Sequence, residues 1–174
     1  LRLHIYEFFE ENKCSRSLDY DKIAVWDKAC KMGDLEALCR IKDWIKSKYD
    51  DRCDLDASLK HVYYHTHLRK CMNEYTFAHI ASMGHLHIMK WTKKQGLQND
   101  SRLSLTENAA MNGQLDMFVY LLQEGEPFSP WESGTAHLSI IQYLSQKNEH
   151  SDYIKHSWFC AAKKDNWSLL EWLL

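Results

Sequence analysis

A short pattern recurs along this chain, and its recurrence limits the possible folds more than any other feature. Each copy has small residues, two variable residues, a turn residue and then an apolar run with helical spacing. The turn positions of the clear copies are Gly33, Gly84, Gly113 and Asp165, and a weaker copy turns at Ala136. This pattern predicts stacked pairs of helices, because neither helix of a pair can bury its apolar face alone.

The residues at the turn explain how each pair is expected to form. Glycine adopts the left-handed conformation of a helix C-terminus without a Cβ penalty, so Gly33, Gly84 and Gly113 are expected to end the first helices. A leucine two residues after each of these glycines then begins the second helix. Small residues before the turn, such as Ala109 and Ala110, let a first helix approach its neighbour closely.

These copies resemble the ankyrin repeat family, in the form in which a Gly-His-Leu-like turn begins the second helix. Gly84-His85-Leu86-His87-Ile88-Met89-Lys90-Trp91 resembles it most closely, although the family's Thr-Pro-Leu-His opening is absent. The resemblance implies an all-α, ankyrin-type helical repeat solenoid of roughly four to six stacked helix pairs. Such degenerate repeats are similar to those seen in large DNA viruses, oomycetes and host-associated bacteria. A tetratricopeptide array is the main rival, but its short turn lacks glycine.

The organisation of the chain follows from the turn positions. Residues 1–18 are expected to form a capping or leftover helix, and residues 19–174 an ankyrin-like repeat domain truncated at its C-terminus. The copy that turns at Ala136 is expected to have a shortened first helix, near residues 130–133. The interval of residues 34–83 is the longest between two turns. It holds either a degenerate repeat, which we favour, or a helical insertion.

The two alternatives for this interval differ in where they place a turn and a helix. A degenerate repeat would turn near Cys53-Asp54-Leu55. A helical insertion would have the segment from Asp56 to Lys70 as its second helix.

Composition and motifs exclude several classes of function. A net charge of −2 gives no general attraction to phosphate or acidic membranes, and no apolar stretch approaches the length of a membrane span. Six cysteines without a Cys-x-x-Cys pair indicate reduced thiols and an intracellular, cytoplasmic protein. Gly-rich phosphate loops and common hydrolase motifs are absent from the sequence. We therefore expect no enzyme activity, cofactor, nucleic acid, membrane or small-molecule substrate.

One cluster of metal-ligating residue types lies in the longest interval. His61 and His65 are one helical turn apart on one face, and His67 and Cys71 are one turn apart on another. Because the two pairs point in different directions around one helix, a single zinc ion could not easily bind all four. A polar helix edge is the favoured interpretation, and no metal site is predicted.

The two variable residues before each turn are the candidate binding residues. By the resemblance, these positions line the concave surface on which ankyrin arrays bind partners. They are Lys31 and Met32, Ser82 and Met83, Met111 and Asn112, and Lys163 and Lys164. Methionines at three successive turns could form an adaptable apolar strip, or they could fill the grooves between repeats. Both alternatives remain open from the sequence.

Two further groups have structural interpretations. His85 and His137 follow a turn position, where the resemblance implies that a polar residue braces the loop. Trp91 and Trp172 follow the apolar run of a second helix and are expected in the core.

The sequence as a whole favours a protein–protein interaction module that holds a partner's loop or helix on its concave repeat surface. A host-factor binder or an adaptor would fit the resemblance. The alternative is a regulatory or substrate-targeting repeat segment of a larger enzyme whose catalytic domain lies elsewhere.

Overall fold

The computed structural model describes residues 18–50, 56–72, 74–97, 104–128, 137–147, 151–163 and 165–174. Every regular element in these ranges is an α-helix, so the all-α prediction is confirmed there. The helices are α2 (Leu18–Met32), α3 (Leu35–Asp50), α4 (Ala57–Cys71), α5 (Glu74–Ser82), α6 (Leu86–Lys94), α7 (Leu105–Met111), α8 (Leu115–Gln123), α10 (Leu138–Gln146), α11 (Ser151–Lys163) and α12 (Trp167–Leu173). None of these helices is both long and apolar enough to cross a membrane.

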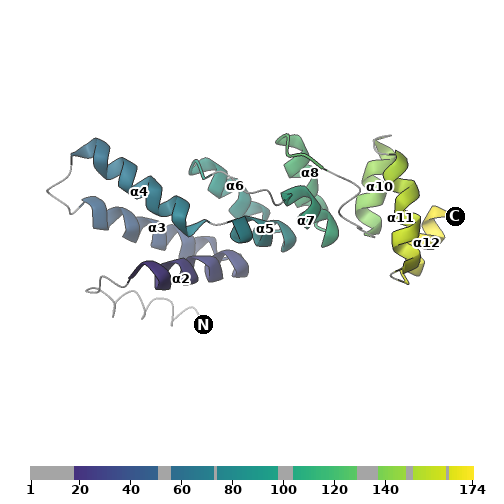
Figure 1. The fold of residues 1–174 in the computed structure, drawn as a ribbon, viewed down its shortest axis with the longest axis horizontal. Coiled ribbons are helices and arrows are strands. Elements are labelled where there is room, and N and C mark those ends of the chain that lie inside the picture. The colour runs from purple at the N-terminus through teal and green to yellow at the C-terminus, as the bar shows by residue number, and fades with distance from the viewer. Residues whose placement is uncertain are drawn as a thin grey trace.

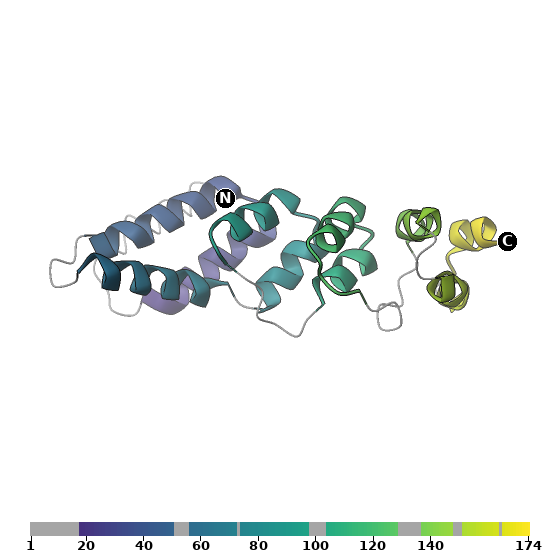
Figure 2. The same ribbon diagram turned by 90° about the horizontal axis from the view of Figure 1, so that it is seen from above.

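The helices form pairs that follow one another along the long axis of the molecule (Figure 1). The first helices α2, α5 and α7 contact one another in succession, and the second helices α6, α8 and α10 do the same. The pair of α11 and α12 follows, with α11 against α10. Figure 2 shows this succession from above, with α3 and α4 at one end of the molecule and α12 at the other.

The predicted turns share one backbone geometry. The φ angle is 70° at Gly33, 70° at Gly84, 69° at Gly113 and 52° at Asp165. At each turn the N–H of the turn residue donates to the carbonyl three residues earlier, and the next N–H donates to the carbonyl five residues earlier. In the third copy these bonds join Gly113 to Ala110 at 3.1 Å and Gln114 to Ala109 at 2.9 Å. This is the Schellman geometry, in which a left-handed residue satisfies the last carbonyls of a helix.

The interval between the first two turns contains one inserted helix. The helix α3 continues without a turn to Asp50, because its apolar residues Leu38, Ile41 and Ile45 keep helical spacing and are all buried. The helix α4 then packs against both α3 and α2. Asp56 caps α4, since its Oδ1 accepts a hydrogen bond of 2.8 Å from the backbone N–H of Leu59.

The favoured prediction of a degenerate repeat in this interval is therefore wrong. The ring of His85 reaches back to the carbonyl of Lys31, so the turns at Gly33 and Gly84 are direct neighbours. The turn predicted near Cys53-Asp54-Leu55 lies outside the described residues. The insertion alternative placed a helix from Asp56 to Lys70, which matches α4 to within a residue at each end.

Two other boundaries can be compared with the sequence analysis. Residues 1–17 lie outside the described ranges, and Leu18 already belongs to α2 rather than to a separate N-terminal helix. The shortened first helix near residues 130–133 also lies outside them, although α10 follows as a second helix.

The two tryptophans expected in the core have different environments. Trp91 packs against the core, with its ring centroid 6.0 Å from that of Trp26. Trp172 is 40% exposed, so the core prediction is wrong for this residue. It lies on α12, whose main neighbour among the described helices is α11.

Candidate functional site

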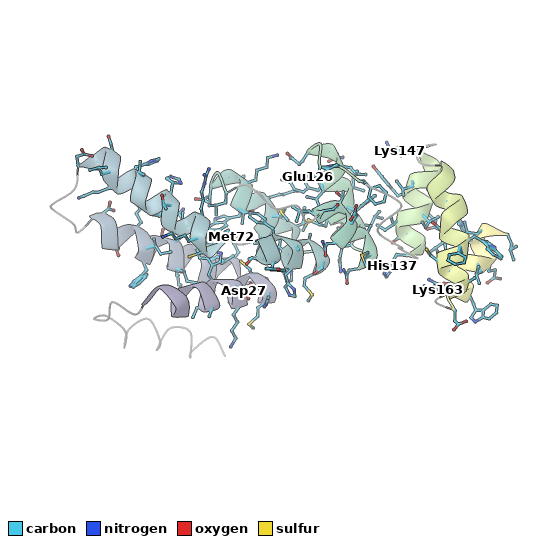
Figure 3. The ribbon with its side chains drawn as sticks, viewed as in Figure 1. Asp27, Met72, Glu126, His137, Lys147 and Lys163 are labelled. Carbon is cyan, nitrogen blue, oxygen red and sulfur yellow. The ribbon has the colours of Figure 1, made fainter. Side chains whose placement is uncertain are left out.

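The C-terminal ends of the first helices place the candidate binding residues. Lys31 and Met32 are the last residues of α2, Ser82 ends α5 just before Met83, and Met111 ends α7 just before Asn112. Because α2, α5 and α7 contact one another in succession, these six residues lie on neighbouring helices, and we call them the first-helix face. Lys163 ends α11 much farther along the array (Figure 3), and Lys164 lies outside the described residues.

The three methionines are surface residues. Their exposed fractions are nearly equal, at 51% for Met32, 49% for Met83 and 48% for Met111. A methionine that filled the groove between two helix pairs would be buried. The structure therefore favours the surface strip over the groove-filling alternative.

A shallow groove of about 310 Å³ crosses the three first helices beside these methionines. Its lining residues are Asp27 and Lys31 from α2, Tyr75, Ala78, His79 and Ser82 from α5, and Asn108 from α7. Two of the candidate residues, Lys31 and Ser82, are therefore part of the groove. Tyr75, at 69% exposure, adds an aromatic side chain to the predicted surface.

The charges at the groove are paired within the protein. The Nζ of Lys31 lies 2.7 Å from the Oδ2 of Asp27, one helical turn away. The Oδ1 of Asp27 accepts a hydrogen bond of 3.2 Å from the hydroxyl of Thr76 on α5. This surface therefore has no strong net charge, and it offers hydrogen bonds and apolar contacts to a partner.

The sequence analysis missed five of the lining residues, and helical geometry could have found four of them. Asp27 lies one turn before Lys31, and Asn108 one turn before Asn112, so each pair shares a helix face. The amide Nδ2 of Asn112 in fact donates to the carbonyl of Asn108 at 2.8 Å. Tyr75 and His79 are similarly one turn apart on α5.

Histidines from the following helix pair hold the backbone of the first-helix face. The carbonyl of Lys31 accepts a hydrogen bond from the Nε2 of His85 at 3.1 Å, and the carbonyl of Met111 accepts one from the Nε2 of His137 at 2.9 Å. His87 binds the carbonyl of Gly33 in the same way at 3.0 Å. The expected bracing role of His85 and His137 is thus seen directly, and it fixes two of the candidate binding residues.

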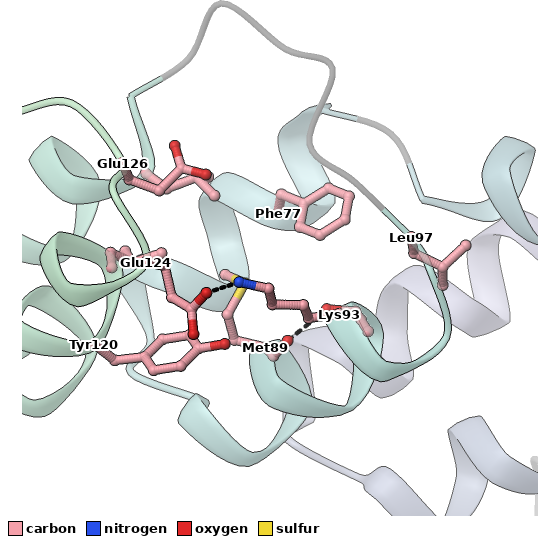
Figure 4. A pocket seen from close by; sticks show the side chains of 10 residues that line it. Phe77, Met89, Lys93, Leu97, Tyr120, Glu124 and Glu126 are labelled. Atoms are coloured by element: carbon pink, nitrogen blue, oxygen red, sulfur yellow. Dashed lines mark hydrogen bonds and ion pairs between the residues drawn. The ribbon is translucent and has the colours of Figure 1, made fainter.

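The opposite side of the array contains a second cavity, of about 290 Å³, between α6 and α8 (Figure 4). Its apolar lining includes Phe77, Met89 and Leu121, which also form the buried contact between two helix pairs. Lys93 and Glu124 form an ion pair across it. We interpret this cavity as a packing cleft at the contact between pairs.

The metal alternative gains no support from the described part of α4. The rings of His61 and His65 are neighbours, with centroids 4.3 Å apart, but Cys71 is buried. Desolvation, followed by the charges of His61 and Arg69, lowers the pKa of His65. Within the described residues no three potential ligand side chains gather to hold a metal ion, and the side chain of His67 is not among them.

The buried thiol of Cys30 is unsuited to nucleophilic chemistry. Burial, followed by the charges of Asp27 and Cys71, raises its pKa to about 12. Because the thiolate is the reactive species, this thiol is inert at neutral pH.

Comparison of the chain with protein-family models, curated proteins and solved structures finds no match.

Proposed function

We propose that this chain is a protein–protein interaction module, without chemistry of its own, that binds a partner on the first-helix face. The observation that carries the proposal is the row of three half-exposed methionines beside a groove on α2, α5 and α7. Exposed apolar side chains that gather on one surface are typical of interaction sites. The methionine side chain is flexible and polarisable, so such a strip can adapt to an apolar partner segment.

The proposal includes the architecture as an ankyrin-type solenoid, in which the first helices line the concave side. The equivalent left-handed turns and the succession of helix contacts support this assignment. Rigid helices and braced turns hold the binding residues in place before the partner arrives, which lowers the ordering cost of binding.

The spacing of the helices suggests the size of the partner segment. Packed helices lie about 8–10 Å apart, so a row across three first helices spans about 16–20 Å. An extended segment of about six residues covers this distance, and a short helix covers it as well. We propose a loop or helix with apolar side chains as the bound element, in a host factor or in the client of an adaptor.

The proposal is tested by capture of binding proteins from a cell lysate, with matched variants of the chain. The native chain is compared with a variant carrying Met32→Glu, Met83→Glu and Met111→Glu. The control carries Leu59→Glu and Val62→Glu on α4, because these residues are similarly exposed, at 45% and 57%, but lie away from the first-helix face. Circular dichroism and thermal unfolding first establish that all three proteins fold.

The expected result is a set of proteins retained by the native chain and by the α4 control but lost with the methionine variant. Equal retention by all three would place the interface on another surface and contradict the proposal. The alternative, a targeting segment of a larger enzyme, predicts the same loss of binding. The full-length sequence distinguishes the two proposals, because only this alternative requires a neighbouring catalytic domain.

A further inference from the structure

The inserted helix α4 uses only one of its sides for packing. Tyr64, Leu68 and Cys71 are spaced four and three residues apart, so they lie on one face of the helix. Leu68 and Cys71 are buried and Tyr64 is partly buried, because this face packs against α3 and α2. The opposite side is left at the end of the molecule that α3 and α4 form (Figure 1, Figure 2).

The side of α4 opposite the packing face carries exposed residues along most of its length. They are Leu59, Val62, Thr66, Arg69 and Lys70, and we call them the outer α4 face. Their spacing of three and four residues joins them into one stripe about 16 Å long. Leu59 and Val62 make the first half of the stripe apolar, and Arg69 and Lys70 make its second half cationic.

The charged side chains of α4 all have the same sign. The helix contains Lys60, Arg69 and Lys70 but no aspartate or glutamate, although the whole chain has a net charge of −2. Cations in the last turn stabilise a helix dipole, but the same effect favours acids in the first turn, and α4 has none there. The stability of the helix therefore does not account for its composition.

Arg69 and Lys70 have no carboxylate partner within the described residues. The ion pairs found there lie on α2, on α3 and between α6 and the end of α8. Desolvation first, and then the charges of His61 and Arg69, lower the pKa of His65. The positive groups of α4 therefore act on one another, and a partner's carboxylates would relieve this repulsion.

The two halves of the stripe together define the occupant. A phosphate polymer would use the cationic half but would leave Leu59 and Val62 exposed to water. An amphipathic helix that runs antiparallel to α4 would use both halves. Its first turns would contact Arg69 and Lys70, and carboxylates are favoured in the first turn of a helix by its dipole. Its later turns would cover the apolar half.

We propose that the outer α4 face is a docking surface for an amphipathic helix of a partner protein, antiparallel to α4. Arg69 and Lys70 follow Leu59 and Val62 by seven to eleven residues. The partner helix therefore carries apolar side chains about seven to eleven residues after its carboxylates, which places both on one helix face. The first-helix face shares no residue with this surface, so the two proposals are independent.

A designed peptide tests the proposal on the full 174-residue chain. The probe is a helix-forming synthetic peptide with glutamates in its first turns and leucines on the same face about two and three turns later. The control peptide has lysine in place of each glutamate. Fluorescence anisotropy measures the affinity of both peptides. The native chain should bind the glutamate peptide at least about tenfold more tightly than the lysine peptide.

Matched charge variants show whether the peptide binds at α4. Arg69→Glu with Lys70→Glu should weaken binding of the glutamate peptide at least about tenfold and strengthen binding of the lysine peptide. Lys94→Glu with Lys147→Glu makes the same change in net charge at exposed positions on α6 and at the end of α10. This control should bind the glutamate peptide within about twofold of the native chain, because distant surface charges are screened by salt.

The apolar half is tested by Leu59→Ser with Val62→Ser, which should weaken binding of the glutamate peptide at least about fivefold. The methionine variant of the first-helix face should bind this peptide as the native chain does, so failure of either proposal is seen separately. Circular dichroism first establishes that each variant folds. If the charge reversal disturbs α4, Arg69→Gln with Lys70→Gln removes the charges without placing acids at the end of the helix.

Three results would overturn the proposal. Equal affinity for the two peptides, or an equal loss in both charge variants, would show that this surface does not recognise carboxylates. Binding of a thymidine oligonucleotide that the charge reversal abolishes and the serine variant does not change would make a phosphate polymer the occupant. A dimer of the native chain that dissociates on the charge reversal would make a second copy the occupant.

Discussion

The pair of α7 and α8 and the pair of α11 and α12 follow the same sequence plan, but they bury it differently. Thr106 and Ala110 on α7 are fully buried, whereas the equivalent Trp158 and Ala162 on α11 are exposed. The more apolar residue, tryptophan, is thus the exposed one. In a stack of helix pairs, burial depends on the neighbouring pair as much as on the side chain, because each pair contacts only its neighbours.

The largest expected difference between the two regions comes from one tryptophan in each. The ring of Trp26 is fully buried and contacts Trp91, and its Nε1 lies 2.9 Å from the Sδ of Met72. Trp26→Ala should therefore lower the free energy of unfolding by about 3–5 kcal/mol. Trp158→Ala, at the same position before its turn, should cost less than about 1 kcal/mol. Urea unfolding measures both, and equal losses would show that Trp158 is also buried.

The next effect compares two glycines with similar backbone angles. Gly113 and Gly125 have φ of 69° and 83°, so alanine is strained at either position. A Cβ at Gly113 would also lie 2.6 Å from the Nδ1 of His137, whereas a Cβ at Gly125 meets nothing within 4 Å. We expect losses of about 2–3 kcal/mol for Gly113→Ala and about 1 kcal/mol for Gly125→Ala.

The same urea titration separates these two glycine variants. If both variants lose the same free energy of unfolding, His137 does not pack on the turn at Gly113, and the contact between these two helix pairs is disproved.

The bracing hydrogen bond makes a smaller contribution. His137→Ala removes the bond to the carbonyl of Met111 and should cost about 1 kcal/mol. His61→Ala, on the exposed surface of α4, serves as the control and should change stability by less than about 0.5 kcal/mol. A thermal unfolding midpoint that moves equally in both variants would contradict the bracing role.

The smallest expected effect is a gain of stability in the last pair. Asp165 occupies the left-handed conformation with φ of 52°, which glycine adopts without a Cβ penalty. Asp165→Gly should therefore stabilise α11 and α12 by up to about 1 kcal/mol, visible as slower amide exchange of these helices. Faster exchange would mean that the aspartate side chain stabilises this turn.

The sequence predicts the fold well where the turn carries a local signal. Glycine at Gly33, Gly84 and Gly113 specifies a left-handed residue, and the flanking residues specify helices, so both could be predicted without tertiary information. The sequence could predict that the inserted segment α4 is a helix, but not that this helix is an insertion between two neighbouring pairs. Its role depends on contact with α3 and on the direct contact between the turns at Gly33 and Gly84.

Prediction of the candidate site follows the same division. Counting back from the turn identifies Met32 and Met83, but their exposure depends on how neighbouring helices pack, and the sequence left both alternatives open. The groove residues Asp27 and Asn108 share helix faces with predicted residues and could have been found. That these residues line one groove across α2, α5 and α7 could not be predicted, because it depends on how the helices stack.

The most direct test of this account is native-state hydrogen exchange of the whole chain. Amides of α7, with helix pairs on both sides, should exchange at least about a hundredfold more slowly than amides of α12, because opening the last pair breaks contacts on one side only. The amides of Asn108 in α7 and of Leu170 in α12 are suitable reporters, since each donates to the carbonyl of its helix's N-cap residue, Asn108 to Ser104 at 3.2 Å and Leu170 to Asn166 at 3.1 Å. Equal protection of the two helices would contradict the account, because burial in the array would then not depend on neighbouring pairs.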